Sequence, residues 1–144
     1  LVAATGSSFP VLTKTPGQSQ QERQEEVDCI GDALVSGKNV VIAGGGATGV
    51  ELAGDILETF PADSRKGKVT LICSSDRLID DQPEYYSERC KKALEELGCT
   101  ILFNDRVTSH TDTTVATSGE PIHLELKSGK TLDCHAYVAA YARG

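Results

Sequence analysis

The sequence lacks an excess of basic residues, a long apolar run and any methionine. Only 14 residues are Lys or Arg, against 21 that are Asp or Glu, which gives a formal net charge of −7. Non-specific nucleic-acid binding and attachment to anionic membranes need clustered Lys and Arg, so this balance argues against both. No apolar run approaches the length that a membrane-spanning helix needs.

Cysteine pairs of the disulfide, redox or metal-binding kind are also missing. The chain has no C-x-x-C pair and no Cys/His cluster at metal spacing, and its cysteines are odd in number: Cys29, Cys73, Cys90, Cys99 and Cys134. We expect reduced thiols that pack as small apolar side chains, and a redox dithiol is the alternative. Reduced thiols favour an intracellular, cytoplasmic location. If the chain is part of a longer protein, association of that protein with mitochondria or a membrane surface is left open. We expect no bound metal. No histidine is assigned a catalytic role.

The residues that are present are typical of one globular domain. Hydrophobic residues make up 39% of the chain and charged residues 24%. A chain of 144 residues can bury a substantial core, but it is short for an oxidoreductase that binds two nucleotides.

A glycine-rich segment after a short apolar run is the most informative feature. Residues 40–43 are apolar without alternation, which is typical of a parallel strand buried on both faces. Gly44, Gly46 and Gly49 follow with G-x-G-x-x-G spacing, and a helical pattern begins at about Ala47. This order predicts a dinucleotide-binding site, and a purely structural glycine turn is the alternative.

Each glycine of the motif has its own physical task. Gly44 permits the tight turn that leaves the strand, and Gly46 lacks the Cβ atom that would hold a pyrophosphate off the backbone. Gly49 lets the following helix lie close to the sheet. Backbone N–H groups and the positive end of that helix then face the anionic phosphates.

The segments around the glycines predict a βαβ unit preceded by a helix. A polar run from about Ser19 leads into a helix that Gly37 is expected to end. A helix over residues 47–60 and a buried strand over 68–73 complete a right-handed unit with the first strand. A third helix is expected from Pro83, with Asp81 or Gln82 as its cap and Gly98 at its end.

The last third of the chain changes to alternating patterns. After a short strand over residues 100–103, the segment 107–140 predicts a small antiparallel ribbon with a half-buried strand over 122–126. Residues 136–140 are expected to return to the parallel sheet. The predicted fold is therefore α/β, a Rossmann-like three-layer domain with a parallel sheet plus a small antiparallel β-ribbon.

The end of the second strand leaves the choice between NAD and NADP open. NAD-binding folds carry an acidic residue there that bonds the ribose 2′-hydroxyl, whereas this chain has Cys73-Ser74-Ser75. Ser74 and Ser75 can bond a hydroxyl or a phosphate, and Arg77 or Lys68 can accept a 2′-phosphate. A plain surface charge is the alternative for Arg77.

The chain resembles the NAD(P)H-binding domain of the FAD-dependent pyridine nucleotide(-disulfide) oxidoreductases. The features that match in order are Thr5-Gly6, a Pro-bearing connector, a lead helix, the G-x-G-x-x-G-x-E segment from Gly44 to Glu51, and a terminal antiparallel ribbon. Within that family the chain is most similar to the apoptosis-inducing-factor-like and ferroptosis-suppressor-type NAD(P)H:quinone reductases. The chain departs from the family pattern at Tyr141-Ala142, where Thr-Gly or Ile-Gly is usual.

The resemblance implies a nicotinamide domain inserted into an FAD domain. Residues 19–140 would be the NAD(P)H-binding domain, 10–18 a connector, and 1–9 with 141–144 the edges of the FAD domain. The cofactors would be NADH or NADPH here and FAD in the full-length parent. Hydride would pass from nicotinamide to flavin and on to a quinone-like acceptor, so the partners would be the FAD domain and that small-molecule acceptor.

The resemblance also implies roles for particular residues. Glu51 would be the catalytic residue that positions hydride transfer, and a carboxylate that merely favours the helix N-terminus is the alternative. Thr5 and Gly6 would belong to the flavin-domain seam. The cofactor-binding residues would be Gly44, Gly45, Gly46, Ala47, Thr48, Gly49, Ser74, Ser75 and Arg77.

Two other functions compete with the oxidoreductase. One is a non-catalytic module that responds to NAD(P)H occupancy by altering a partner interface. The other is a Rossmann-type methyltransferase that binds S-adenosylmethionine. That class commonly has an acidic residue at the end of its second strand, so Ser74 and Ser75 disfavour it.

Overall fold

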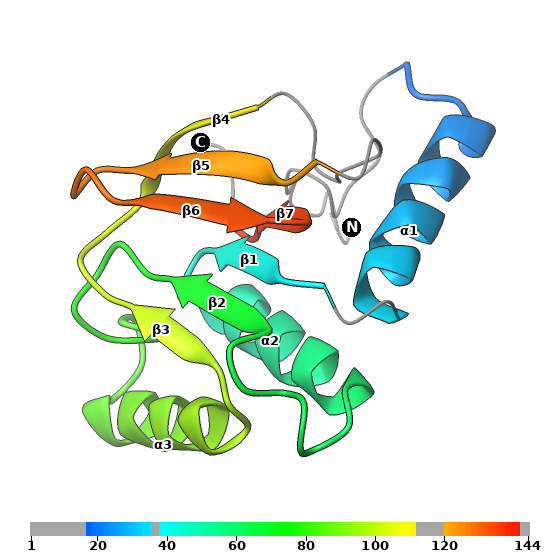
Figure 1. Cartoon of the computed structure of the whole chain (residues 1–144). Helices are drawn as coiled ribbons and strands as arrows, with labels where there is room; N and C mark the ends of the chain where they lie inside the picture. Colours follow the sequence, from blue (N-terminus) through cyan, green and yellow to red (C-terminus); the bar gives the residue numbers. More distant parts are fainter. Residues whose placement is uncertain (1–16, 36–37, 112–119, 142–144) are drawn as a thin grey trace, which may run out of the picture.

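The computed structural model describes residues 17–35, 38–111 and 120–141. A parallel sheet has the strand order β3-β2-β1-β7, and an antiparallel sheet has the order β4-β5-β6. The elements, shown in Figure 1, are α1 (Gln20–Val35), β1 (Val40–Ala43), α2 (Ala47–Thr59), β2 (Val69–Ile72), α3 (Glu84–Glu96), β3 (Thr100–Leu102), β4 (Val107–His110), β5 (Ile122–Leu126), β6 (Thr131–Cys134) and β7 (Ala136–Ala139).

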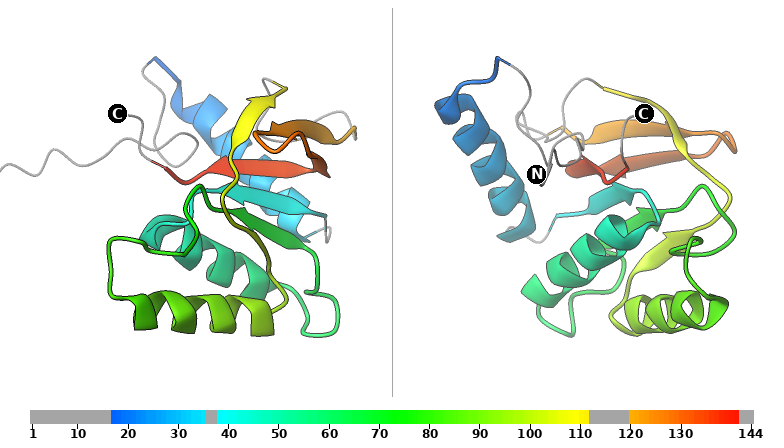
Figure 2. Two further views of the ribbon diagram at one scale, coloured as in Figure 1. Left: turned by 90° about the vertical axis from the view of Figure 1, so that its left-hand side faces the viewer. Right: turned by 180° about the vertical axis from the view of Figure 1, so that it is seen from behind.

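The molecule has three layers. Helices α2 and α3 cover one face of the parallel sheet, and the antiparallel sheet covers the other (Figures 1 and 2). Val40 and Ile42 of β1 pack with the helices, whereas Val41 and Ala43 pack with the antiparallel sheet. Both faces of β1 are therefore buried, which is why its sequence is apolar without alternation. The predicted fold class is confirmed.

The strand β1 places the ends of its neighbours together. It pairs in parallel with β2, where Ala43 lies opposite Ile72, and with β7, where Ala43 lies opposite Ala139. The loop after β1, the loop after β2 and the residues after β7 consequently meet at one edge of the sheet. Ligands of open α/β sheets bind outside this carboxyl edge.

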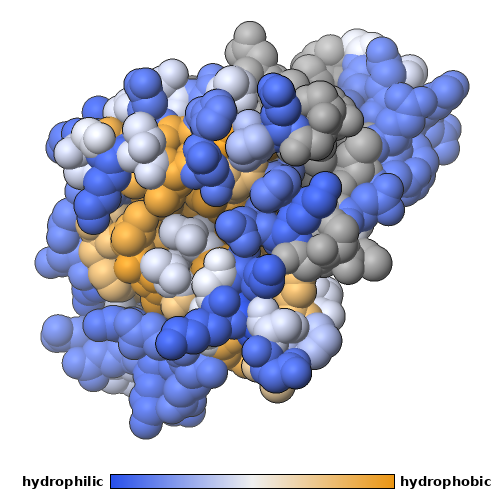
Figure 3. All heavy atoms as spheres, in the orientation of Figure 1, coloured by the Kyte–Doolittle hydropathy of each residue, from blue (hydrophilic) through white to orange (hydrophobic). Residues whose placement is uncertain are grey.

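The antiparallel sheet shows the expected alternation, and the cluster between the two sheets includes half-buried residues at its margin. The residues of β5 are alternately buried and exposed, as predicted for a half-buried strand. Leu102, Val107 and Leu132 pack only half-buried against the core beneath it. Figure 3 shows apolar surface gathered over β2 and β3, below the antiparallel sheet.

Two helix ends differ from the sequence prediction. Pro83 is the N-cap residue of α3, with ψ 143°, so the helix begins at Glu84 and neither Asp81 nor Gln82 caps it. The extended conformation at Pro83 lets its carbonyl accept the N–H of Tyr86 at 3.0 Å. Helix α2 ends at Thr59, one residue before the prediction. Gly98 follows α3 with φ +93°, as expected of a C-terminal glycine.

Helix α1 begins with a reciprocal cap. The Ser19 hydroxyl accepts the N–H of Glu22 at 3.1 Å, and the Glu22 carboxylate accepts the N–H of Ser19 at 2.7 Å. The predicted helix stop at Gly37, the Thr5-Gly6 pair and most of the connector lie outside the described residues. Among the described helices, none is both long and apolar enough to cross a membrane.

Candidate functional site

The glycine loop between β1 and α2 forms the centre of the site. Gly44 has φ +128°, a conformation that L side chains rarely adopt, and a Cβ atom there would lie 2.6 Å from the Ala140 carbonyl oxygen. A Cβ atom on Gly49 would overlap the Gly44 carbonyl oxygen. The tight turn at Gly44 and the close approach of α2 at Gly49 are confirmed.

The second glycine of the loop is needed for a reason that its position in the motif does not reveal. A Cβ atom on Gly45 would overlap the Cys73 Sγ atom, which itself donates to the Arg77 carbonyl oxygen at 3.3 Å. The Gly45 carbonyl oxygen accepts the N–H of Ile79 at 2.8 Å. The loop after β2 is thus fastened directly under the glycine loop.

Gly46 faces open space at the start of α2. It is the N-cap residue, with φ −75° and no side-chain cap hydrogen bond, and a Cβ atom built on it would meet no atom within 4 Å. The backbone N–H groups of the first helical turn have no intrahelical acceptor, and the helix dipole adds positive potential there. This geometry suits a bound phosphate group.

A cavity of about 320 Å³ opens in front of this loop. It brings together every predicted cofactor-binding residue except Gly49, which lies beneath the loop against Gly44. Its lining residues are Gly44, Gly45, Gly46, Ala47, Thr48, Cys73, Ser74, Ser75, Arg77, Asp80, Ala140 and Tyr141.

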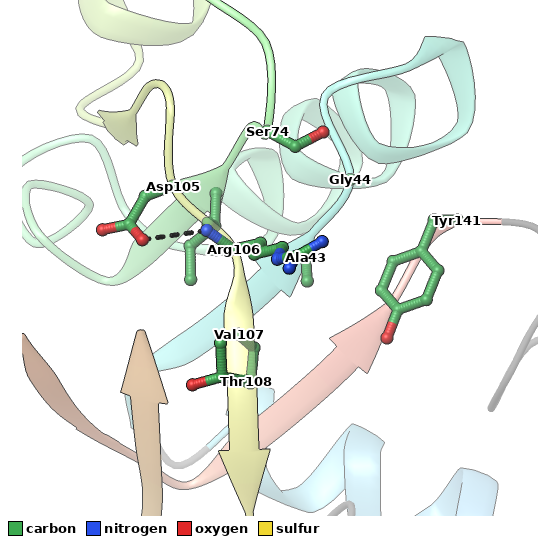
Figure 4. A pocket seen from close by; sticks show the side chains of 9 residues that line it. Ala43, Gly44, Ser74, Asp105, Arg106, Val107, Thr108 and Tyr141 are labelled. Carbon is green, nitrogen blue, oxygen red and sulfur yellow. Dashed lines mark hydrogen bonds between the residues drawn. The ribbon is translucent and has the colours of Figure 1, made fainter. Parts of the chain in front are cut away.

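A second cavity of about 590 Å³ continues along the same edge and shares Gly44, Ser74 and Tyr141 with the first. Figure 4 shows the Arg106 side chain reaching into it toward Gly44, with the Tyr141 ring on the opposite side. The Asp105 carboxylate turns away, and its Oδ1 atom accepts the Arg106 N–H at 2.9 Å (Figure 4). The remaining lining residues are Ala43, Ile72, Val107 and Thr108.

Sequence reasoning missed three charged residues of these cavities, of which Asp105 turns its carboxylate away from the larger cavity (Figure 4). Arg106 follows β3 and Asp80 lies in the loop after β2, so each comes from a segment at the carboxyl edge. A charged residue shortly after a predicted parallel strand was the available signal for Arg106. Nothing in the pattern marked Asp80, because several residues separate it from the strand end.

Two predicted residues lie elsewhere. Lys68 directly precedes β2, at the amino end of the sheet, so its proposed contact with a 2′-phosphate is wrong. Glu51 is exposed on α2 and lines neither cavity within the described part of the chain. The structure therefore does not place Glu51 among the residues that line the two cavities, and its role in positioning hydride transfer stays a prediction.

Four of the cysteines pack as apolar side chains. Cys73, Cys99 and Cys134 are buried and Cys90 is half-buried, all as free thiols. Burial raises the pKa of Cys99 to about 11 and that of Cys134 to about 12, so both thiols are neutral at pH 7. Among the residues that the structure describes, no group of three or more His, Cys, Asp or Glu side chains is placed to hold a metal ion.

Comparison with known proteins gives one family match. The sequence model of the family described as pyridine nucleotide-disulphide oxidoreductase matches residues 1–142. An FAD-dependent oxidoreductase of Flammulina velutipes is 30% identical over an alignment of 145 positions that covers 98% of this chain and 41% of that protein. Ferroptosis suppressor protein 1 of Xenopus laevis is 28% identical over 93% of this chain and 36% of its own length.

An apoptosis-inducing factor homolog of Dictyostelium discoideum is 27% identical over 75% of this chain. The match covers 29% of that protein, so the chain spans well under half the length of these relatives.

Solved structures share the fold. The covalent putidaredoxin reductase–putidaredoxin complex matches 81% of this chain and 26% of its own chain, with a TM-score of 0.63 and 20% identity. A water-forming NADH oxidase of Lactobacillus brevis, bound to NADH, matches 88% of this chain and 25% of its own, with a TM-score of 0.60 and 18% identity. These likenesses support the Rossmann-like fold.

Proposed function

The chain belongs to the pyridine nucleotide-disulphide oxidoreductase family, and on this basis we propose that it binds NADH or NADPH as the nucleotide domain of an FAD-dependent oxidoreductase. The observation that carries the proposal is the glycine loop at the carboxyl edge of the parallel sheet. Gly46 leaves open the space that a pyrophosphate needs, and the first turn of α2 presents its N–H groups there.

One of the two adjoining cavities suits the pyrophosphate of an adenosine diphosphate moiety, and the other suits its adenine. The pyrophosphate would lie against Gly46, Ala47 and Thr48, and the adenine would extend past Ser74 into the larger cavity. The Arg106 guanidinium and the Tyr141 ring there offer a flat cation and an aromatic face, which both stack on a purine. The residues present fit the nucleotide.

Residues 19–140 would act in a longer flavoprotein. The nicotinamide would supply a hydride to FAD held by a separate domain, of which residues 1–9 and 141–144 would be the edges, and a quinone-like compound would be the final acceptor. Glu51 is exposed at the glycine end of α2, so it is available to contact the nicotinamide and the flavin domain. This chain would contribute binding, orientation and the exclusion of water.

The proposal is tested by titrating NADH and NADPH into the 144-residue chain by calorimetry. The variant Gly46→Val adds a side chain whose Cβ atom would meet no protein atom within 4 Å and which would fill the phosphate space. Loss of one or two phosphate contacts weakens binding by about tenfold or more. Gly54→Ala is the matched control, because Gly54 also faces open space but lies on α2 away from both cavities.

Thermal unfolding of each variant separates binding from stability, since valine in place of glycine at an N-cap costs about 1 kcal/mol. We expect Gly46→Val to remain folded and to bind weakly, and Gly54→Ala to bind like the wild type. Absence of binding of either nucleotide by the wild type, or unchanged binding by folded Gly46→Val, would contradict the proposal.

A further inference from the structure

The loop between β2 and α3 places a carboxylate in the cavity in front of the glycine loop. Asp80 is exposed and lines the same cavity as Gly46, Thr48 and Ser75. The carboxyl end of β2 itself has no acidic side chain, because Ser74 and Ser75 follow Cys73 there. Asp80 therefore supplies from farther along the loop the acidic group that the strand end lacks.

Three hydrogen bonds fix the position of Asp80. The Ser75 hydroxyl donates to Asp80 Oδ2 at 2.5 Å, and Arg77 Nη2 donates to the Asp80 carbonyl oxygen at 2.6 Å. The N–H of the preceding residue, Ile79, donates to the Gly45 carbonyl oxygen at 2.8 Å. These bonds hold the Asp80 carboxylate at a fixed position relative to the glycine loop, where the pyrophosphate would bind.

The charge around Asp80 is predominantly negative. Asp76 and Asp81 lie exposed in the same loop, and the guanidinium of Arg77 is bonded to the Asp80 backbone. Burial is the main cause of the raised pKa of the Cys73 thiol, and the Asp80 and Asp76 carboxylates raise it further against the opposing hydrogen bond of the Ser75 backbone. A second phosphate at this position would meet an unfavourable potential.

We propose that Asp80, held by Ser75, accepts a hydrogen bond from the 2′-hydroxyl of the adenosine ribose and rejects a 2′-phosphate, so that the chain selects NADH over NADPH. The inference rests on the proposed nucleotide-binding function and assigns its specificity. A carboxylate next to a phosphate dianion lowers affinity by about tenfold or more at a partly exposed site. The Ser75 hydroxyl bond orients the carboxylate and leaves Oδ1 available to the ribose.

The competing assignment is Arg106. Its guanidinium reaches into the neighbouring cavity toward Gly44, and a ribose turned that way would place a 2′-phosphate on it (Figure 4). The two residues predict opposite selectivities, so measuring both nucleotides decides between them.

The test measures the dissociation constants of NADH and NADPH by calorimetry for the wild-type chain and for Asp80→Asn. Asparagine keeps the size of the side chain and an acceptor for Ser75 but removes the charge. We expect the wild type to bind NADH at least about tenfold more tightly than NADPH. In Asp80→Asn, NADPH should bind about tenfold more tightly and NADH somewhat more weakly.

Asp81→Asn is the matched control, because Asp81 is the exposed neighbour but does not line the cavity. Its ratio of the two constants should equal that of the wild type. General loosening of the loop would weaken both nucleotides, so an opposite change in the two is specific to the carboxylate.

The outcomes separate the two proposals. Binding of both nucleotides with the same ratio in wild type and Asp80→Asn would overturn the assignment of Asp80 and leave the proposed function standing. Preference for NADPH that disappears in Arg106→Ala would also overturn it. Failure of the wild type to bind either nucleotide would overturn the proposed function and this inference with it.

Discussion

Consecutive glycines in the loop after β1 serve three different physical needs. Gly44 needs its positive φ and Gly45 must leave room for Cys73, whereas Gly46 meets no protein atom. The spacing of the motif predicted the tasks of Gly44 and Gly49. It could not predict that of Gly45, because the atom that excludes a side chain there belongs to a residue after β2.

Glu51 is the residue whose proposed role depends most on the proposed FAD domain. In the proposed full-length flavoprotein, Glu51→Gln should slow reduction of the flavin by NADH by about tenfold or more, because hydride transfer is sensitive to small errors of orientation. The affinity for NADH should change less than about threefold, since Glu51 lines neither cavity. Stopped-flow bleaching of the flavin absorbance measures both values.

Glu58→Gln is the control for this substitution. Glu58 is exposed on the same helix two turns further from the glycine loop, on the same side of α2. Flavin reduction at the wild-type rate in Glu51→Gln, or equal slowing in both variants, would remove Glu51 from hydride positioning.

At the scale of elements, Asp105 joins the two sheets. Its buried carboxylate accepts the Ser128 hydroxyl at 2.5 Å and the Ser128 N–H at 3.1 Å, across the turn between β5 and β6. The Ser128 hydroxyl is the main cause that lowers the pKa of Asp105 below its ordinary value of 3.8. Because Arg106 directly follows Asp105 and donates its N–H to the same carboxylate, these contacts also position the backbone of Arg106.

The pH dependence of stability tests this connection. Because the pKa of Asp105 is lower when folded, its stabilisation is complete above the ordinary value of 3.8 and is lost as the pH falls through the folded value. Ser128→Ala should therefore reduce the free energy of unfolding at pH 7, and the difference from wild type should narrow below pH 3.8. Urea unfolding across this range, with the exposed Ser109→Ala as control, measures it. If the difference in free energy of unfolding between the wild type and Ser128→Ala did not depend on pH, this result would contradict the role of Asp105.

The elements themselves were largely predictable, and the loops between them were not. Apolar runs and glycine spacing predicted β1, α2 and β2 because both faces of a central parallel strand are buried and helix approach demands a small residue. The loop after β2 turns at Ile79 with φ 47°, a conformation that is rare for a β-branched residue. The conformational preferences of the loop residues therefore did not predict that Asp80 lies in the cavity in front of the glycine loop.

In the whole molecule, two helical crossovers and a third through the antiparallel sheet bring the functional residues to one edge of the parallel sheet. The parallel order β3-β2-β1-β7 aligns the glycine loop, the serine pair and Tyr141, and the antiparallel sheet closes the opposite face. The order of elements was readable from the sequence, whereas the side-chain position of Arg106 in the larger cavity (Figure 4) was not. The domain boundaries at residues 9, 18 and 140 remain predictions.

The most direct measurement is amide chemical-shift mapping of the ¹⁵N-labelled 144-residue chain during titration with NADH. We expect the largest changes at Gly45, Gly46 and Thr48, with smaller ones at Ser75 and Arg106. The control region is the cavity at the amino edge of the sheet, around Arg65 and Glu96. Changes concentrated there, or no changes at the glycine loop at saturating NADH, would contradict a nucleotide site at the carboxyl edge.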